Sequence, residues 1–328
     1  MAEVSALPQA EPVIGASAPA ARDREEPAVR RSTTVVRRST TVRRSFLGEI
    51  AETFREIWEH RDLVRQLALR DLQVRYAQAV MGFAWAVLTP LLIVLSGMLI
   101  RYAIAQASGS SVALHMVGAT AIKALPWSFF SATISLATAS LLANKALITK
   151  LYFPREAIPL ATVLAQLKDL AVGAAVLVVA LPFLGASLSP ALLWVPVLVL
   201  LLLTLTLASA VFLSCANLFF RDVKYIVQVM LTFGMFVTPI FFEPRAFGPV
   251  GSRLIMLNPL SSIVEGLRLA VIEGHHLLTP LVVVNRAGIE VLAWSPWYLV
   301  YTTVVAVGGL LVSLRLFRRA AFVFAEYV

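Results

Sequence analysis

The longest uncharged stretch of the chain, residues 170–220, reads LAVGAAVLVVALPFLGASLSPALLWVPVLVLLLLTLTLASAVFLSCANLFF. Its 51 residues are more than twice the roughly 20 apolar residues that a helix needs to cross the hydrocarbon core of a bilayer. Residues 185–190, Gly-Ala-Ser-Leu-Ser-Pro, are rich in turn-forming residues and divide the stretch. We therefore predict two transmembrane helices joined by a short turn.

Four further uncharged stretches flank this pair, at residues 82–100, 124–143, 225–242 and 291–314. Each has between 18 and 24 residues, which suits one crossing. The chain is 59% hydrophobic and 14% charged, whereas a soluble domain is about a quarter charged. The sequence predicts an all-α integral membrane protein with six transmembrane helices, in a membrane domain at residues 81–318.

The basic residues favour one orientation in the membrane. If both termini face the cytoplasm, 21 of the 28 Lys and Arg residues lie on cytoplasmic segments, in line with the positive-inside rule. The C-terminal segment 319–328 is then cytoplasmic. We expect the third span to begin near Leu170, so that Lys168 and Asp169 reach the headgroups. The alternative is that the two charges lie inside the span, where charged residues mark a functional site. The net charge of +9 on so apolar a chain favours anionic membrane lipids as a partner, and not nucleic acid.

Two segments precede the first span. Residues 1–45 contain an imperfect Arg-Arg-Ser-Thr-Thr repeat and lack the apolar core of a signal peptide, so we interpret them as a disordered basic tail. The tail can lie near anionic headgroups or be regulated by phosphorylation. Residues 46–80 place Ile50, Phe54 and Ile57 at helical spacing, which predicts amphipathic helices at the membrane interface.

The segment between the fifth and sixth spans contains its own helix signal. Asn258 can cap a helix whose first residue is Pro259, and Gly274 can end it. Ile263 and Leu267 fall on one face of this helix. The pattern predicts a short amphipathic, partly re-entrant helix in the outer interface.

Several short motifs together carry a family resemblance. They are Arg70-Asp71-Leu72-Gln73-Val74-Arg75-Tyr76 with Gly82-Phe83-Ala84-Trp85 and Thr89-Pro90-Leu91, then residues 144–156 with their Phe153-Pro154-Arg155, then Phe220-Arg221-Asp222-Val223, Thr238-Pro239-Ile240 and Asn258-Pro259-Leu260. In this order they resemble the permeases of type-2 ABC transporters, and within these the polysaccharide, O-antigen and teichoic-acid exporters. The resemblance extends from about residue 61 to the C-terminus. The chain departs from the family in its long tail and in Ala77-Gln78-Ala79, where the family usually has Lys and Ser.

The resemblance implies the permease subunit of an ATP-driven exporter that moves a lipid-linked polysaccharide across the bacterial inner membrane. Two copies would form the channel above two ATPase subunits, which would bind ATP and Mg²⁺, so no cofactor is expected in this chain. The sequence contains no Gly-Lys dipeptide and hence no P-loop of its own. We expect a transport subunit and not an enzyme.

Two alternatives stay open at this point: a permease of the same fold for drugs or lipids, and a membrane-embedded glycan-processing enzyme. The enzyme would need acidic or His residues clustered at one face, and the spans offer almost none. The four His residues and Cys215 show no metal-ligand spacing, so no catalytic or metal site is predicted.

The family's coupling element lies in the second inner connection. By resemblance, contact with the ATPase would fall on Asn144, Lys145, Lys150, Phe153, Pro154 and Arg155. A short basic helix at the inner surface can dock in a groove and transmit a rigid-body shift. The alternative is that these basic residues serve only as inside-positive charges.

Export of a lipid-linked glycan needs an anion site, a path and a gate. Guanidinium groups bind phosphate bidentately, and the predicted entry site is Arg70, Arg75 and Tyr76. The predicted path is aromatic, at Phe83, Trp85, Phe233, Phe236, Phe241 and Phe242. The predicted outer gate is Asn258, Pro259, Glu265 and Arg268. The alternatives are snorkelling of Arg70 to headgroups, ordinary packing of the aromatic residues, and a plain interfacial anchor for the outer helix.

Overall fold

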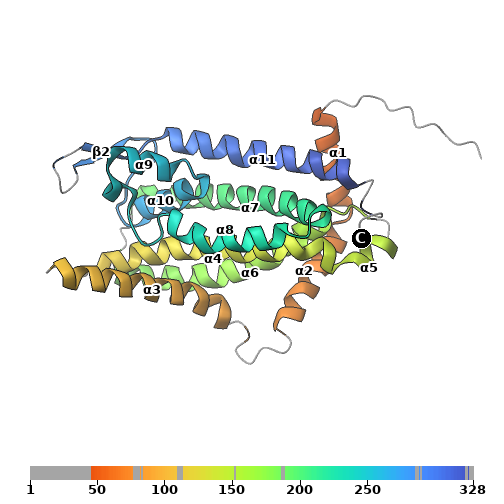
Figure 1. Cartoon of the computed structure of the whole chain (residues 1–328), viewed down its shortest axis with the longest axis horizontal. Helices are drawn as coiled ribbons and strands as arrows, with labels where there is room; N and C mark the ends of the chain where they lie inside the picture. The colour runs from red at the N-terminus through yellow and green to blue at the C-terminus, as the bar shows by residue number, and fades with distance from the viewer. Residues whose placement is uncertain are drawn as a thin grey trace, which may run out of the picture. The chain divides into compact units, whose positions relative to one another are not determined.

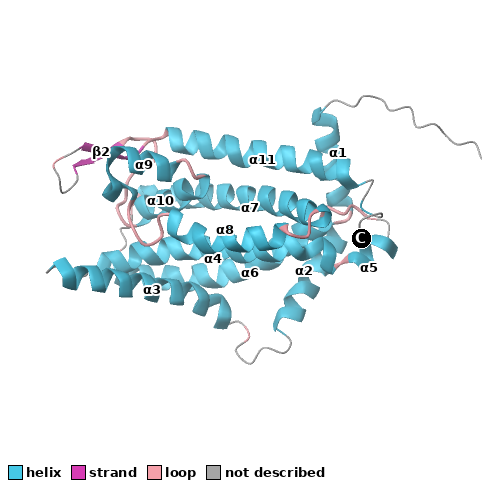
Figure 2. Ribbon diagram, in the orientation of Figure 1, coloured by secondary structure: helices cyan, strands magenta, loops and turns pink. Residues whose placement is uncertain are grey.

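The computed structural model describes residues 46–76, 82, 84–108, 114–150, 153–185, 189–284, 288, 290–321 and 324. The predicted tail at residues 1–45 and Phe83 lie outside the described residues, as do the side chains of Arg75, Tyr76 and Lys150. In the described part of the chain, the regular elements are helices and one two-stranded hairpin, joined by loops (Figure 2). The prediction of an all-α membrane fold is therefore confirmed in its main features.

Long helices lie side by side in a bundle (Figure 1). They are α3 (Ala84–Ser108), α4 (Leu114–Ala143), α6 (Ala157–Ala180), α7 (Trp194–Phe219), α8 (Val223–Val237) and α11 (Trp297–Ala321). Helix α7 packs against α4, α6 and α11, and its Leu198 and Leu202 are buried in the main core. The most apolar stretch of the sequence therefore supplies the centre of the bundle.

Four of these helices are long and apolar enough to cross a membrane, at His115–Ala143, Ala157–Leu184, Pro190–Phe219 and Trp297–Ala321. Helices α3 and α8 contain shorter apolar segments, Val87–Ile100 and Val223–Val237. Each of the six predicted spans thus corresponds to a helix, whereas the number of crossings stays a prediction.

The predicted break in residues 170–220 is present. The chain leaves α6 through a 3₁₀ turn, Leu181–Leu184, and enters α7 through another, Pro190–Leu193. Gly185 adopts the left-handed conformation with φ of 81°, which glycine tolerates because it has no Cβ. The Ser189 hydroxyl accepts a hydrogen bond from the backbone of Ala191 at 3.3 Å and so caps the second turn.

Two helix boundaries differ from the sequence prediction. Helix α6 begins at Ala157, so Lys168 and Asp169 lie in the middle of this helix and not at its start. The sixth apolar stretch begins as a strand, and α11 starts only at Trp297, directly after Pro296. In both cases the uncharged stretch and the helix begin at different residues, because tertiary packing decides where the helix starts.

One end of the bundle, the α2 end, is crossed by α1 (Phe46–Glu59), α2 (Arg61–Tyr76) and the short α5 (Lys145–Lys150) (Figure 1). The predicted amphipathic segment is thus two helices. Val64, Leu67 and Ala68 of α2 are buried against three small residues of α6, Ala157, Ala161 and Ala165. These alanines recur every four residues and let the two helices approach closely.

The opposite end, the hairpin end, contains the chain between α8 and α11. It comprises the 3₁₀ helix Pro244–Phe247, α9 (Gly248–Met256), α10 (Pro259–Val271) and the antiparallel strands β1 (Leu281–Val284) and β2 (Glu290–Trp294) (Figure 1). Trp294 anchors the hairpin, because its fully buried indole donates a 2.8 Å hydrogen bond to the carbonyl of Leu277.

Candidate functional site

The predicted entry residue Arg70 contacts the predicted coupling residue Asn144. Its guanidinium donates hydrogen bonds to Asn144 Oδ1 at 2.6 Å and to Asp71 Oδ1 at 2.8 Å. Asn144 in turn donates to the carbonyl of Ser140 at the end of α4, at 2.9 Å. Arg70 stays 43% exposed, so part of its charge faces the surroundings. Helix α2 is therefore joined to the chain between α4 and α5.

The rest of the chain between α4 and α6 divides into an exposed part and a packed part. Lys145, in α5, is exposed. Phe153 packs against the core between α2 and α6 and against the core around Phe317. Arg155 donates a hydrogen bond to the carbonyl of Ala321 and lies 5.5 Å from the ring centre of Phe324. Arg155 of the Phe-Pro-Arg motif thus connects the α2 end to Ala321 and Phe324.

A second arginine, Arg318 in α11, lies among three carboxylates at the same end. Its guanidinium is 2.6 Å from Glu56 Oε2 and 3.7 Å from a carboxylate oxygen of Glu52, both in α1. It also lies 3.7 Å from Glu156, which directly precedes α6. Burial raises the pKa of Glu156, and the neighbouring Arg318 opposes that rise. These four residues, the Arg318 cluster, connect three helices that are distant in sequence.

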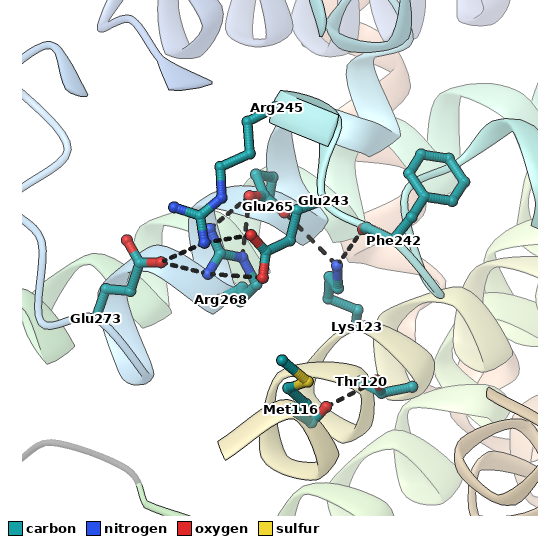
Figure 3. Close-up of polar contacts among 9 residues, drawn as sticks. All are labelled: Met116, Thr120, Lys123, Phe242, Glu243, Arg245, Glu265, Arg268 and Glu273. Carbon is teal, nitrogen blue, oxygen red and sulfur yellow. Dashed lines mark hydrogen bonds and ion pairs between the residues drawn. The ribbon is translucent and has the colours of Figure 1, made fainter. Parts of the chain in front are cut away.

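The hairpin end holds a larger and more deeply buried set of charges (Figure 3). The set comprises Lys123 of α4, Glu243 and Arg245 before α9, Glu265 and Arg268 of α10, and Glu273, and we call it the buried charge cluster. Its three cations and three carboxylates balance each other. Removing an ion from water costs free energy unless an opposite charge lies beside it. The equal numbers of cations and carboxylates therefore allow these charges to be buried.

Arg268 is the centre of the cluster. It donates two hydrogen bonds to Glu265 Oε1, at 2.9 and 2.7 Å, and one to Glu273 Oε1 at 2.6 Å. It also lies 4.0 Å from Glu243, which forms an ion pair with Arg245. Burial alone would raise the pKa of Glu243, but Arg268 and then Arg245 outweigh it and lower that pKa.

Lys123 connects α4 to this cluster. Its ammonium is completely buried, donates a 2.7 Å hydrogen bond to the carbonyl of Phe242 and lies 3.7 Å from Glu265 Oε2 (Figure 3). Glu265 Oε2 accepts no hydrogen bond from the described residues. The ion pair between α4 and α10 is therefore longer than the hydrogen bonds that Arg268 donates to Glu265 and Glu273.

Asn258 and Pro259 occupy the helix start that the sequence predicted. The Asn258 side chain accepts a 3.1 Å hydrogen bond from the backbone of Leu260 and donates one to the Thr238 hydroxyl at 3.2 Å. Tyr301, in the second turn of α11, donates to the carbonyl of Leu257 at 2.9 Å. The start of α10 is thus fixed to the end of α8 and to α11.

Helix α10 differs from the expected interfacial helix in one respect. Every residue from Leu260 to Val271 is buried, with α4, α7 and α11 packed around it. Glu265 and Arg268 therefore lie inside the protein and contact each other, whereas the sequence placed them near an interface. The pattern shows an apolar face, but it cannot show that neighbouring helices cover the polar face too.

The predicted aromatic path is distributed over two environments. Trp85, Phe233 and Phe236 are exposed on α3 and α8, and Phe242 is half-buried. Phe241 is buried against α3, where a Cβ at Gly97 would lie 2.8 Å from its ring. The exposed members face the surroundings of the bundle, whereas Phe241 fills its core.

Three residues that form ion pairs at the two ends were not predicted as site residues from the sequence. Lys123 and Arg318 carried only the signal of charges near the ends of spans, and Glu243 carried none. A charged residue within an apolar helix is the signal that could have singled out Lys123, because such residues need a partner.

Comparison with known proteins adds a family match to this geometry. Residues 62–272, from α2 through α10, match the family described as ABC-2 type transporter. The O-antigen export system permease protein RfbA of Myxococcus xanthus is 28% identical over 249 residues, which cover 74% of this chain and 92% of that protein. Two Klebsiella pneumoniae proteins of the same name are 27% identical over 214 residues (65% of this chain, 81% of that protein) and 28% over 206 (62% and 77%).

Proposed function

This chain belongs to the ABC-2 type transporter family, and we propose that it is the permease subunit of an ATP-driven exporter of lipid-linked polysaccharide. The observation that carries the proposal is the similarity to permeases named for O-antigen export, one of them covered over 92% of its length. The second observation in its favour is the arrangement of charge at the two ends of the bundle. That the cargo is a polysaccharide is part of the proposal, whereas the family assignment does not depend on the cargo.

In this proposal the chain crosses the bacterial inner membrane six times with both termini in the cytoplasm. The α2 end is then the inner end, which agrees with the basic residues of the inner connections. The hairpin end faces outward. Helices α3 and α8 would be the other two spans. Because their apolar segments are shorter than those of the other spans, the bilayer would be locally thinner beside them or the neighbouring helices would tilt.

A second copy of the chain would complete the channel. One side of α8 leaves large apolar side chains uncovered: Ile226, Val229, Met230, Phe233, Phe236 and Val237. An apolar surface of this kind marks a contact with lipid or with another subunit. We assign it to the second copy, with the exposed aromatic residues at the boundary of the glycan path.

Two ATPase subunits would dock beneath the α2 end and supply the bound ATP and Mg²⁺. The support is the exposed α5 with Lys145, and the hydrogen bond that joins Asn144 to Arg70. A shift of α5 would move Asn144 and, through it, α2. The same arginine that would meet a lipid-linked phosphate is thereby connected to the ATPase contact. Arg75 and Tyr76 follow it by five and six residues, about one and a half turns along α2.

The buried charge cluster would serve as the outer gate. Helix α10 packs against α4, and the 3.7 Å ion pair of Lys123 with Glu265 between them is longer than the 2.6 Å pair of Arg268 with Glu273. Opening would therefore separate Lys123 from Glu265 and keep the Arg268 bonds. The closed state is favoured in the absence of cargo, since separated buried charges are costly.

The proposal is tested by removing the chain from its cell and identifying the lipid-linked material that accumulates. We expect polymer on a polyprenyl carrier inside the cell and its loss from the surface, with recovery when the chain is restored. Arg70→Ala should fail to restore export, whereas Arg55→Ala, an exposed arginine of α1, should restore it. Unchanged surface polymer together with retained drugs or lipids would move the assignment to a permease for those substrates.

A further inference from the structure

An open apolar groove lies at the α2 end, between the α1–α2 corner and the first turns of α6. Its volume is about 330 Å³. Leu69 and Leu72 of α2 form one wall, and Leu160 and Leu164 of α6 form the other. This volume is at the lower end of the range of small-molecule sites, which suits a single hydrocarbon chain better than a folded ligand.

Two arginines line this groove, one helical turn apart. Arg61 and Arg65 are both exposed, and among the described residues neither has a carboxylate partner. Asp62 lies between them in sequence but does not line the groove. Glu59, the other nearby acid, is paired with Arg55 at 2.9 Å. The groove therefore carries two positive charges that nothing in the described structure neutralises.

The indole of Trp58 completes the mouth of the groove. It is 70% exposed, and the Arg61 guanidinium lies 5.7 Å from its ring centre. An exposed tryptophan next to basic residues is typical of the headgroup level of a bilayer. Stacking on the indole holds Arg61 beside the groove and leaves its hydrogen-bond donors free for an anion.

We propose that this groove binds one anionic glycerophospholipid of the inner leaflet. An acyl chain would lie between Leu160 and Leu164 and the wall of α2, and Arg61 and Arg65 would bind the phosphate and headgroup. Basic pockets beside transmembrane helices on the cytoplasmic side bind anionic lipids in this way. A glycerophospholipid is favoured over the polyprenyl carrier because one of its unbranched acyl chains is slimmer than a methyl-branched polyprenyl chain, while its second acyl chain can stay in the bilayer. In addition, Arg70, the predicted entry residue, does not line the groove.

A bound lipid would fix the angle between α2 and α6. The two helices otherwise meet where Val64, Leu67 and Ala68 of α2 pack against the small Ala157, Ala161 and Ala165 of α6. The lipid would fill the open side of this contact. Because α2 carries Arg70, the composition of the inner leaflet would influence the predicted entry site. This inference rests on the proposed orientation, and not on the proposed cargo.

The test measures lipid retention by the full-length chain and does not use transport. The protein is purified in detergent, and its co-purified lipids are removed. It is then placed in nanodiscs of phosphatidylcholine that contain increasing fractions of phosphatidylglycerol. Retained phosphatidylglycerol is counted by native mass spectrometry. We expect one tightly held molecule per chain, and about 30-fold weaker retention in Arg61→Gln/Arg65→Gln, since each basic side chain near an anionic surface contributes roughly fivefold.

Two further variants separate charge from shape. Arg55→Gln/Arg221→Gln removes the same charge from exposed sites outside the groove and should retain the lipid. Leu164→Trp fills the groove, keeps both arginines, changes a side chain that is already partly exposed, and should lose the lipid. Equal loss in the control pair would show a general surface attraction and overturn the site.

The identity of the occupant is tested by competition. Inorganic phosphate should not displace the lipid, because it lacks the chain. Polyprenyl phosphate should displace phosphatidylglycerol only weakly. Stronger binding of polyprenyl phosphate than of phosphatidylglycerol would overturn the assignment to a glycerophospholipid and would assign the groove to the polyprenyl carrier. Normal lipid retention in a chain that exports no polysaccharide would leave this inference standing while the proposed cargo fails.

Discussion

Each end of the bundle has an arginine with three carboxylates within 4.0 Å, yet the two arginines lie in different surroundings. Arg318 at the α2 end is 22% exposed, and two of its partners, Glu52 and Glu56, are more exposed still. Arg268 at the hairpin end is 3% exposed and Glu265 only 1%. The two clusters contain the same kinds of groups, but water reaches the central arginine and most of its partners at the α2 end and is excluded from Arg268 and Glu265 at the hairpin end.

The difference follows from solvation. Ion pairs that water reaches contribute about 0–1 kcal/mol each, because water competes for both partners. Buried pairs gain little when formed but cost several kcal/mol when one partner is removed, because the other charge stays behind without water. The α2 end can thus rearrange helix by helix, whereas at the hairpin end separating a buried charge such as Lys123 from its partner is costly.

The largest expected effect comes from breaking the buried charge cluster at Glu265. Glu265→Gln removes the carboxylate that Lys123 and Arg268 share, and we expect a loss of stability of about 3–5 kcal/mol. The measurement is the thermal unfolding midpoint of the detergent-solubilised chain. Glu290→Gln, an exposed carboxylate at the start of β2, is the matched control and should leave the midpoint unchanged.

A companion variant identifies the cause of that loss. Lys123→Met/Glu265→Gln removes one charge of each sign, so the remaining cluster is balanced again. We expect the double variant to be more stable than Glu265→Gln alone, which is a non-additive result typical of charges in contact. Additive losses would indicate that cavities, and not unpaired charges, destabilise the single variant.

The next effect concerns the anchoring of α10 at its start. Asn258→Ala removes the side chain that caps Leu260 and reaches Thr238, and we expect a loss of about 1 kcal/mol, within the usual range for a helix cap. Ser189→Ala removes a cap of a short 3₁₀ turn and is the control with little expected effect. Equal shifts of the two unfolding midpoints would show that the contact with Thr238 adds nothing.

A smaller effect on stability is expected at the α2 end. Arg318→Gln removes ion pairs with the partly exposed Glu52 and Glu56 and with the buried Glu156. Because the three pairs share one guanidinium, their contributions do not add, and we expect about 1 kcal/mol of lost stability. Because the pairs connect α1, α6 and α11, the same variant should reduce export more than it reduces stability. A shift of the unfolding midpoint as large as that of Glu265→Gln would remove the distinction between the two ends.

The sequence predicted the features that depend on local pattern. Uncharged length located the helices of the bundle, residues 185–190 marked the break between α6 and α7, and Asn258-Pro259 marked the start of α10. The family resemblance, read from motifs in order, is confirmed. In each case the signal lies within a few residues of the structure that it specifies.

The features that escaped prediction depend on partners distant in the chain. Lys123 meets Glu265 across more than a hundred residues, and no local pattern indicates which carboxylate a buried lysine will reach. The β-hairpin was missed because β2 and α11 form one continuous apolar run, in which Pro296 is the only local break. The roles of the predicted entry, path, coupling and gate residues stay predictions.

The smallest expected effect separates the two ends by the sign of their pH dependence. Glu243 has a lowered pKa, so its ionised form stabilises the fold; this contribution is complete above the pKa of the unfolded chain and is lost as the pH falls through the folded pKa. Glu156 has a raised pKa, so its ionised form costs stability above the folded pKa, and that cost disappears as the pH falls to the unfolded value.

Acidification should therefore weaken the hairpin end and relieve the α2 end. At neutral pH, Glu243→Gln should lower the unfolding midpoint and Glu156→Gln should raise it slightly. The Glu156→Gln difference should shrink as the pH falls towards about 4, where carboxyl groups of unfolded chains take up protons. The Glu243→Gln difference should persist down to that pH and shrink only below it, as the pH falls through the lowered folded pKa. The midpoints are compared at constant ionic strength, so that screening does not change with pH. Differences of the same sign in the two variants would mean that burial, and not the neighbouring arginine, decides the charge state at both ends.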